Sequence, residues 1–267
     1  MSLTRYLKSP EEMRRLQDVL AAPSFFDIHS LAVTFASDPD VLAELLPPPL
    51  EPAESPHVSV GVFEIGRSNC VGPFAGAAVN IACRYRGEDG FYCVTMPMNT
   101  GLAVTFGREL FAEPKKLAEV SLEVRDGTAR GRVTRQGVTY IELTGRFEGP
   151  PAEAGLKYVT PHYYFRFLPA ANGRGLAYDP ELIRVTHRGT VHRSVPGEGT
   201  VTFRESHHDP VIDIPVLSVT GATLSVGESR TSAEVVTTVP ASEFLPYAYG
   251  KIDDLLEWAE EPASAPA

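Results

Sequence analysis

Two adjacent lysines, Lys115 and Lys116, are the residues whose type and spacing most directly suggest chemistry. The chain has only five lysines, and this pair directly follows Pro114. A lysine amine is almost entirely protonated near neutral pH, and in that form it cannot attack a carbonyl carbon. Burial in an apolar pocket, or a second ammonium nearby, disfavours the charged form and frees the amine to form a Schiff base with a keto substrate. As a dipeptide alone, such a pair more often lies on a solvated surface.

The residues around this pair carry a longer pattern. The run Gly107-Arg108-Glu109-Leu110, followed by Pro114-Lys115-Lys116-Leu117, resembles the signature of the acetoacetate decarboxylase family. Weaker similarities extend over most of the chain, from Leu45-Leu46-Pro47 to Pro215-Val216. The resemblance implies a cone-shaped, mainly antiparallel β-barrel that assembles into a homo-oligomer. It also implies that Lys115 is the Schiff-base lysine and that Lys116 is its electrostatic neighbour.

Acetoacetate decarboxylases surround the lysine with an arginine and two glutamates, and this chain departs from that pattern. Alignment without gaps back from Lys115 places the two glutamate positions on Gly61 and Gly76. The arginine position falls on or beside Ile28 or His29. A glycine cannot orient a β-keto carboxylate or donate a proton. We therefore expect acetoacetate decarboxylation to be very weak or absent.

The retained lysine pair favours other imine chemistry. An imine of a 2-keto acid such as pyruvate can lose a methyl proton, and the resulting enamine can attack an aldehyde. Loss of water from the aldol then gives an unsaturated 2-keto acid, and the reverse sequence is hydration followed by cleavage. We therefore expect a Schiff-base lyase that acts on small 2-keto acids, as a pyruvate aldolase-dehydratase or as a hydratase of unsaturated 2-keto acids.

Two alternatives stay open from the sequence. The first is acetoacetate decarboxylation with another residue replacing the lost acids. A slip of three residues in the alignment would bring Glu64 near the first glutamate position, whereas nothing acidic lies near the second. The second alternative is a barrel without catalytic activity that binds a small keto or hydrophobic ligand.

Imine chemistry also needs a carboxylate clamp and an acid/base group, for which the candidates are less specific. Arg67 lies between the two glycine positions and could hold a carboxylate with two parallel hydrogen bonds, or it could be an exposed turn arginine. Tyr247 and Tyr249 precede the last expected helix. In related Schiff-base enzymes a C-terminal tyrosine acts near the imine, although these two could instead pack the helix on the barrel.

Four further residues flank the lysines in sequence. Arg108 and Glu109 belong to the signature, and we expect a charged pair that braces the lysine loop. Met96 and Met98 could line an apolar pocket around the lysine together with Gly61 and Gly76, or they could be ordinary core residues.

Metal and cofactor signals are weak. His207 and His208 are adjacent, so in a strand their side chains would point to opposite faces, and no third ligand cluster accompanies them. The three cysteines, Cys70, Cys83 and Cys93, form no CxxC motif. We expect no metal site and no cofactor, and we expect the cysteines to be small buried hydrophobes in a reducing cytoplasm.

The chain of 267 residues is expected to form a single domain, 1–267, that positions the lysines. Ser9, Pro10 and Glu12 form a capping box that predicts an N-terminal helix over residues 9–21. A second short helix is predicted after Asp38-Pro39. A C-terminal helix is predicted over about 240–258, with a frayed tail at 260–267.

Short runs with a period of two follow from His57 onward and predict a mainly β domain with peripheral helices. Asp126-Gly127 and Gln136-Gly137 are hairpin signals between three of these runs. Even spacing of short strands favours an antiparallel barrel or sandwich. The expected strand regions are 58–62, 91–106, 120–124, 129–134, 138–143, 158–168, 182–192, 200–205, 216–226 and 233–239.

Composition restricts the partners. With 24 basic and 34 acidic residues the net charge is −10, which argues against binding to a nucleic-acid backbone. No apolar run reaches the ~20 residues of a membrane helix, and the acidic N-terminus is unlike a secretory signal, so a cytoplasmic location is expected. The expected partners are a small-molecule keto acid and further copies of the chain. The aromatic run Tyr163–Phe167 predicts surface that a tetramer or larger assembly would cover.

Overall fold

The computed structural model describes residues 4–152, 154–256 and 259. In this part of the chain the helices are α1 (Pro10–Ala21), α2 (Pro39–Leu45), α3 (Gly101–Phe111) and α4 (Ala241–Ala248), with the 3-10 helices η1 (Val211–Asp213) and η2 (Tyr249–Lys251). The strands are β1 (Ser24–Ala36), β2 (Glu51–Pro52), β3 (Val58–Ser68), β4 (Phe74–Tyr85), β5 (Glu88–Met98), β6 (Lys115–Leu117), β7 (Glu119–Arg125), β8 (Thr128–Arg135), β9 (Val138–Arg146), β10 (Leu156–Arg166), β11 (Glu181–Phe203) and β12 (Ser218–Thr238).

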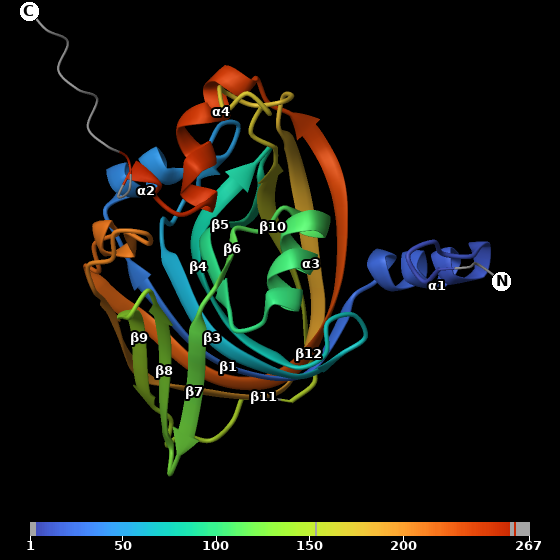
Figure 1. Cartoon of the computed structure of the whole chain (residues 1–267). Helices are drawn as coiled ribbons and strands as arrows, with labels where there is room; N and C mark the ends of the chain where they lie inside the picture. The colour runs from blue at the N-terminus through green and yellow to red at the C-terminus, as the bar shows by residue number, and fades with distance from the viewer. Residues whose placement is uncertain (1–3, 153, 257–258, 260–267) are drawn as a thin grey trace, which may run out of the picture.

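Most of these strands form a closed ring. The hydrogen-bonded order β10-β5-β4-β3-β1-β12-β11 returns to β10, because β10 also pairs with β11. All pairs in the ring are antiparallel except β10–β5, which is parallel. Figure 1 shows the curved wall that the ring makes, with α3 lying inside its curve. The predicted mainly antiparallel barrel is confirmed.

Strands β11 and β12 are longer than the sequence pattern predicted. Residues 182–192 and 200–205 belong to one strand, and 216–226 and 233–239 belong to another. Register shifts interrupt their pairing between Val191 and Arg193, which bends the strands without ending them. The far end of β11 leaves the ring and pairs with β9, and β8 and β7 extend the sheet from there.

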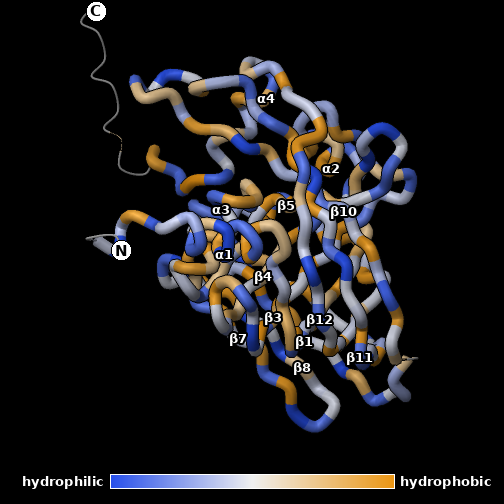
Figure 2. Tube along the Cα trace, turned by 90° about the vertical axis from the view of Figure 1, so that its right-hand side faces the viewer, coloured by the Kyte–Doolittle hydropathy of each residue, from blue (hydrophilic) through white to orange (hydrophobic). Residues whose placement is uncertain are grey.

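Apolar side chains pack on both faces of the ring strands. The larger cluster lies between the ring and the β7–β9 extension, where a Cβ at Gly131 would lie 2.7 Å from the Val62 side chain. The second cluster joins β3, β4, β5 and β10 to α3 and includes Phe74 and Met98. Figure 2 shows the hydrophobic residues alternating with hydrophilic ones along the strands, as expected for a sheet with two different faces.

Local signals account for several element boundaries. Ser9 and Glu12 form the predicted capping box at the start of α1. The predicted hairpin turns are present at Asp126-Gly127 and Gln136-Gly137, where all four residues have positive φ, as a two-residue turn of type I′ requires. Helix α1 extends away from the ring (Figure 1), and none of its residues is buried.

Three structural expectations were wrong. The run 91–106 is not one strand, because β5 ends at Met98 and α3 begins at Gly101 with Thr100 as its N-cap. The C-terminal helix is shorter than 240–258, since α4 ends at Ala248 and a 3-10 turn follows. Residues 257–258 and the tail 260–267 lie outside the described residues. The aromatic run from Tyr163 is core and not exposed surface; Tyr163, Tyr164 and Phe165 are each at most 3% exposed.

Candidate active site

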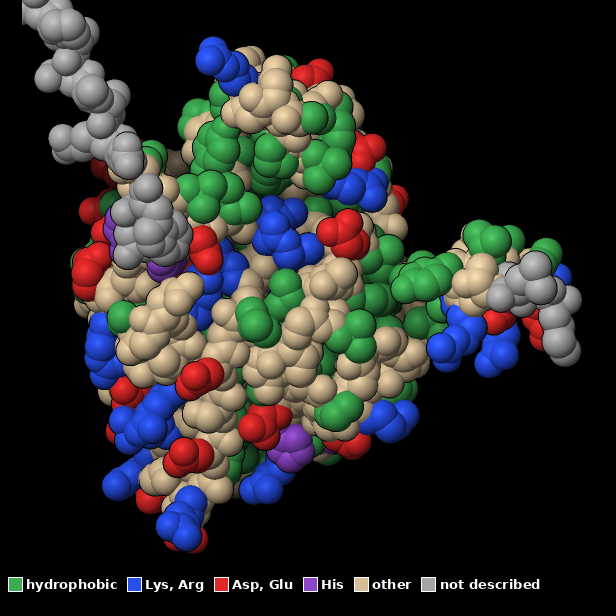
Figure 3. All heavy atoms as spheres, in the orientation of Figure 1, with side chains coloured by type: hydrophobic (Ala, Val, Ile, Leu, Met, Phe, Trp, Pro, Cys, Tyr) green, Lys and Arg blue, Asp and Glu red, His purple; other side chains and the backbone are tan. Residues whose placement is uncertain are grey.

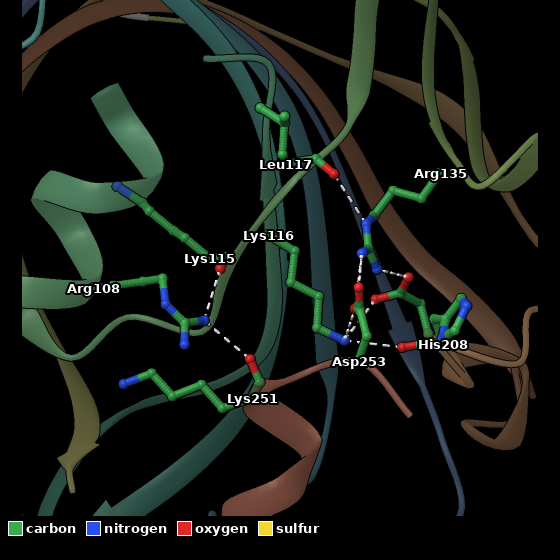
Figure 4. Close-up of polar contacts among 9 residues, drawn as sticks. Arg108, Lys115, Lys116, Leu117, Arg135, His208, Lys251 and Asp253 are labelled. Atoms are coloured by element: carbon green, nitrogen blue, oxygen red, sulfur yellow. Dashed lines mark hydrogen bonds and ion pairs between the residues drawn. The ribbon is translucent and has the colours of Figure 1, made fainter. Parts of the chain in front are cut away.

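The lysine pair lies on the short strand β6, which the preceding helix places against β5. Helix α3 ends at Phe111, and its C-cap Ala112 has a φ of 60°, which turns the chain back towards the ring. Strand β6 then runs parallel to β5, with Lys115 opposite Met96 and Lys116 opposite Pro97. Consecutive side chains of a strand point to opposite faces. The two lysines are therefore directed to different environments, as Figure 4 shows.

Lys115 points into a buried environment that contains a carboxylate. Its Nζ lies 2.8 Å from Oε2 of Glu113 and 5.9 Å from the centre of the Phe74 ring. Lys115 is 8% exposed and Glu113 is 5% exposed. A carboxylate at this distance can accept a proton from the amine or return it. Sequence reasoning missed Glu113. The backbone N–H of Lys115 donates to the backbone oxygen of Glu113 at 2.8 Å, and this tight turn at Pro114 accompanies the contact of the two side chains.

The signature glycine makes room for this pair. A Cβ at Gly107 would collide with the carboxylate of Glu113 and would lie 2.5 Å from Nζ of Lys115. Any larger residue at this point of α3 would therefore displace the two polar groups. The absence of a side chain at Gly107 therefore leaves the space that the amine of Lys115 occupies.

Lys116 lies in an ionic cluster on the other side of β6. Its Nζ donates to the backbone oxygen of His208 at 2.9 Å and to Oδ1 of Asp209 at 3.2 Å, and it lies 3.5 Å from Oδ1 of Asp253. Arg135 pairs with both of these aspartates, and its Nε donates to the backbone oxygen of Leu117. The expectation that Lys116 is the electrostatic neighbour of the Schiff-base amine does not match this geometry.

Two of the positions that the alignment assigned to the family's charged groups, Ile28 and Gly76, have apolar surroundings. Ile28 and Phe63 pack against the cluster that contains Met98. A Cβ at Gly76 would lie 2.5 Å from Sδ of Met98 and 2.9 Å from Phe63, so these two side chains occupy the space of a longer residue. Gly61 pairs with Ala78, and a Cβ added at Gly61 would meet no atom closer than 4.0 Å.

Two other sequence candidates lie away from Lys115. Glu64 is exposed and lies on the opposite face of β3 from Gly61. Arg67 is exposed, and its guanidinium stacks on the Phe26 ring with its Cζ 4.0 Å from the ring centre. The prediction that Arg67 enters the cavity of the lysine was wrong, because the arginine continues the exposed end of β3.

Two histidines and a tyrosine from β10 and β11 interact electrostatically with Lys115 or Glu113. Burial, followed by the charge of Lys115, lowers the pKa of His187 to about 4. Burial, followed by the neighbouring His187, lowers the pKa of His162 to about 3. Among the described residues, Nδ1 of His162 and the hydroxyl of Tyr164 have no hydrogen-bond partner. Neutral polar groups are therefore available close to the amine.

Arg108 connects the lysine strand to the C-terminal segment through backbone contacts. Its Nη1 donates to the backbone oxygens of Lys115 and Lys251, both at 3.0 Å (Figure 4). Glu109 is exposed and forms no ion pair with Arg108 in the described structure. The predicted charged pair is thus wrong for the glutamate, and the brace consists of the arginine and two carbonyl groups.

The predicted tyrosines line separate cavities. Tyr247 lines a cavity of about 650 Å³ that also contacts Lys116, Asp209 and Phe244. Tyr249 is 49% exposed and lines a smaller cavity next to Arg108. Ala112, Pro114 and Tyr164 also line the cavity of Tyr247, whereas neither Lys115 nor Glu113 lines this cavity or the one at Tyr249. Met96 and Met98 are buried in the apolar cluster beside Lys115, consistent with both of the roles expected for them.

The described residues contain no group of three or more metal-ligating side chains. Nε2 of His207 lies 3.2 Å from Oδ2 of Asp254, and His208 presents its backbone oxygen to Lys116. Within the same residues no helix is long and apolar enough to cross a membrane.

Comparisons with known proteins agree with this fold. The family model for acetoacetate decarboxylase matches residues 8–238. Acetoacetate decarboxylase of Burkholderia multivorans is 27% identical over 216 residues, which cover 76% of this chain and 86% of the relative. The crystal structure of acetoacetate decarboxylase from Legionella pneumophila superposes with a TM-score of 0.74 at 20% identity, covering 81% of this chain and 87% of that one.

A second kind of enzyme has the same fold. The enduracididine biosynthesis enzyme MppR, in complex with the condensation product of pyruvate and imidazole 4-carboxaldehyde, superposes with a TM-score of 0.63 at 17% identity. The match covers 83% of this chain and 90% of MppR. One fold therefore carries more than one substrate chemistry.

Proposed function

The chain belongs to the acetoacetate decarboxylase family, and we propose that within it this protein is a Schiff-base lyase acting on small 2-keto acids. The observation that carries the proposal is the buried contact of 2.8 Å between Nζ of Lys115 and Oε2 of Glu113. A nucleophilic amine and an acid/base group within hydrogen-bond distance are the two parts that imine formation needs.

The first half of the reaction uses both groups. Glu113 accepts a proton from the ammonium of Lys115, and the free amine attacks the keto carbon of the substrate. The protonated Glu113 then returns a proton to the carbinolamine oxygen, which leaves as water and gives the imine. The apolar side chains of Phe74 and Met98 limit the access of bulk water during these steps.

In the second half of the reaction, the protonated imine withdraws electrons from the neighbouring methyl carbon and makes its protons acidic. Loss of a proton from the methyl carbon of a pyruvate imine gives an enamine, whose carbon attacks an aldehyde. Loss of water from the aldol and hydrolysis of the imine release an unsaturated 2-keto acid and regenerate Lys115. Read in reverse, the same steps hydrate and cleave such an acid. The complex of MppR with a pyruvate condensation product supports this reaction class.

The wall opposite the lysine disfavours β-keto acid decarboxylation of the kind expected from the family. At Gly61 and Gly76 no side chain is present, and Met98 and Phe63 occupy the space next to Gly76. On this basis we assign little or no acetoacetate decarboxylation to the protein.

One observation favours acetoacetate decarboxylation as a second candidate function. Glu113 is a buried acid next to the amine and could replace the two missing glutamates. The relatives named acetoacetate decarboxylase also cover most of the chain.

Trapping distinguishes the candidates. Borohydride reduction in the presence of pyruvate is expected to add the mass of the reduced ligand to Lys115, whereas acetoacetate is expected to release little carbon dioxide. Carbon dioxide release at enzymatic rates, roughly 1–1000 per second, would favour the decarboxylase. If no 2-keto or 3-keto acid can be trapped on Lys115, the protein is a ligand-binding barrel and the proposal is wrong.

A further inference from the structure

A small cavity lies beside the lysine strand, where the C-terminal segment crosses the end of α3. Its volume is about 180 Å³, below the ~300–1,000 Å³ typical of sites for drug-sized ligands. Arg108 and Lys251 contribute positive charge to it. Figure 3 shows Lys and Arg side chains gathered at this place on the face, below α4. The other lining residues are Glu109, Arg166, Phe167, Leu168, Pro169, Leu176, Tyr178, Ala248, Tyr249 and Ile252.

Two of the three cations that line this cavity form no ion pair in the described part of the chain. In the described part of the chain, neither Arg108 nor Lys251 lies within ion-pair distance of a carboxylate, although the protein has a net charge of −10. Arg166 differs from them, because it pairs with Glu181 at 2.7 Å. Nη1 of Arg108 contacts two backbone oxygens, so its other nitrogens remain available to an anion.

The ammonium of Lys251 is partly enclosed by apolar and cationic groups. Its Nζ lies 5.2 Å from the centre of the Phe167 ring. Burial, followed by the charge of Arg108, lowers the pKa of Lys251 to about 8. An ammonium in such surroundings is stabilised by an anion that enters the cavity.

We infer that Arg108 and Lys251 form a binding site for the carboxylate of a small organic acid, whose apolar body packs on Phe167, Leu168 and Tyr249. The apolar and aromatic lining favours an organic acid over inorganic phosphate, and the volume restricts it to about the size of benzoate. The guanidinium of Arg108 and the ammonium of Lys251 supply charge-assisted hydrogen bonds to the carboxylate. This inference does not rest on imine formation, because the ligand needs no keto group.

Fluorine NMR with 4-fluorobenzoate tests the site on the intact chain. The wild-type protein is expected to shift and broaden the ligand signal at about pH 7, with weak but saturable binding. Lys251→Met should weaken binding about tenfold or more, because a hydrogen bond between charged groups is lost. Lys251→Arg should retain most of the affinity, and Lys157→Met, at an exposed lysine, should have no effect.

The pH dependence gives a second readout. Binding should weaken from about pH 7 to about pH 9, as Lys251 loses its proton, and Lys251→Arg should remove this dependence. The charged and titratable groups that surround Lys251 in this cavity are Arg108, Glu109, Arg166, Tyr178 and Tyr249, and the charge of Glu113 also acts on it. Lys251 also lines a second hollow with Lys115, Lys116, Glu119, Arg135 and Asp253, and a third with Tyr92, Asp209 and Tyr247.

A Lys115→Ala variant separates this inference from the proposed function. It should bind 4-fluorobenzoate as the wild type does even though it cannot form an imine. Loss of binding in Lys115→Ala would place the anion at the imine site and overturn the inference. Absence of binding up to about 20 mM, or equal binding by Lys251→Met, would overturn it as well.

Discussion

Lys115 and Lys116 are neighbours in β6, yet their ammonium groups contact acids on opposite sides of the strand. Lys115 lies 2.8 Å from Glu113, whereas Lys116 lies 3.2 Å from Asp209. The backbone of the strand lies between the two ammonium groups. We therefore do not expect repulsion between them to be what makes Lys115 reactive. Burial and Glu113 are instead the dominant features around Lys115, and Lys116 holds the ionic cluster together.

Substitutions of the two lysines should therefore have different effects on imine trapping. Lys115→Ala should abolish the borohydride-trapped adduct, because no other amine contacts Glu113 in the described residues. Lys116→Met should leave trapping on Lys115 and lower the free energy of unfolding by about 1–3 kcal/mol, because the buried Asp209 loses a partner. Peptide mass mapping and urea unfolding measure the two effects. An adduct on Lys116 would refute the assignment of the nucleophile.

The fold could be predicted from the sequence to the extent that its signals are local. The capping box of Ser9 and the turns at Asp126-Gly127 and Gln136-Gly137 need no distant partner, and all are present. Helix α3 was missed because residues 101–106 include Val104, Thr105 and Phe106, which are typical of strands. Burial of Ala103 and Phe111 against the ring strands overrides that preference.

In the candidate site, too, local features could be predicted from the sequence and features that depend on the tertiary structure could not. Lys115 could be found because its signature is contiguous in sequence. Glu113 is equally near, but its role depends on the tight turn at Pro114, in which the N–H of Lys115 donates to the backbone oxygen of Glu113. The cluster around Lys116 joins β6 and β8 to Asp209, which follows β11, and to Asp253, which follows η2. These residues are distant in sequence, so only the tertiary structure reveals the cluster. Arg67 shows the opposite error, since its sequence position between two candidate glycines did not place it in the cavity.

Gly107→Ala should impair imine formation with little effect on stability. The added methyl group would collide with Glu113 and Lys115, whose flexible side chains can move away without unfolding the helix. A displacement of about 1 Å at a reacting group can reduce the rate by roughly 100-fold. Single-turnover trapping and thermal unfolding measure the two effects. Gly101→Ala is a suitable control, because a Cβ at Gly101 meets nothing within 4 Å.

The half-buried His187 should make the protein sensitive to mild acid. The pKa of His187 falls from 6.5 to about 4 in the folded chain, so between these values the unfolded state binds more protons. Stability is therefore fully present above pH 6.5 and decreases as the pH falls towards about 4, by roughly 1–3 kcal/mol for this residue. Urea unfolding at several pH values measures the slope, which His187→Gln should reduce. The same change at the exposed His192 should leave it unaltered; an identical slope in both variants contradicts the prediction.

The chain is also expected to assemble into a homo-oligomer, although one of the two reasons for expecting this, the exposure of the aromatic run, was wrong. The aromatic residues Tyr163 and Tyr164 are buried within the single chain. Exposed apolar side chains occur instead on α1, where Met13 and Leu16 are 46% and 48% exposed. Light scattering at micromolar concentration should give a mass of several times 29.0 kDa. A monomer at that concentration would contradict the expectation.

Glu113→Gln provides the sharpest test of the proposed acid/base group. Glutamine keeps the size of the side chain and can still contact Nζ of Lys115, but it cannot accept the proton of the ammonium. Imine formation should slow by roughly 100-fold or more, because general acid–base catalysis typically contributes that much. The rate of imine formation between this variant and pyruvate should recover at high pH, where hydroxide removes the proton from the ammonium of Lys115. The wild type should form the imine without high pH. Glu109→Gln is the matched control, since Glu109 is exposed and belongs to the same signature. If Glu113→Gln traps pyruvate as fast as the wild type does, Glu113 is not the acid/base group and a neutral group must transfer the proton. Tyr164 then becomes the residue to test, because its hydroxyl has no hydrogen-bond partner among the described residues.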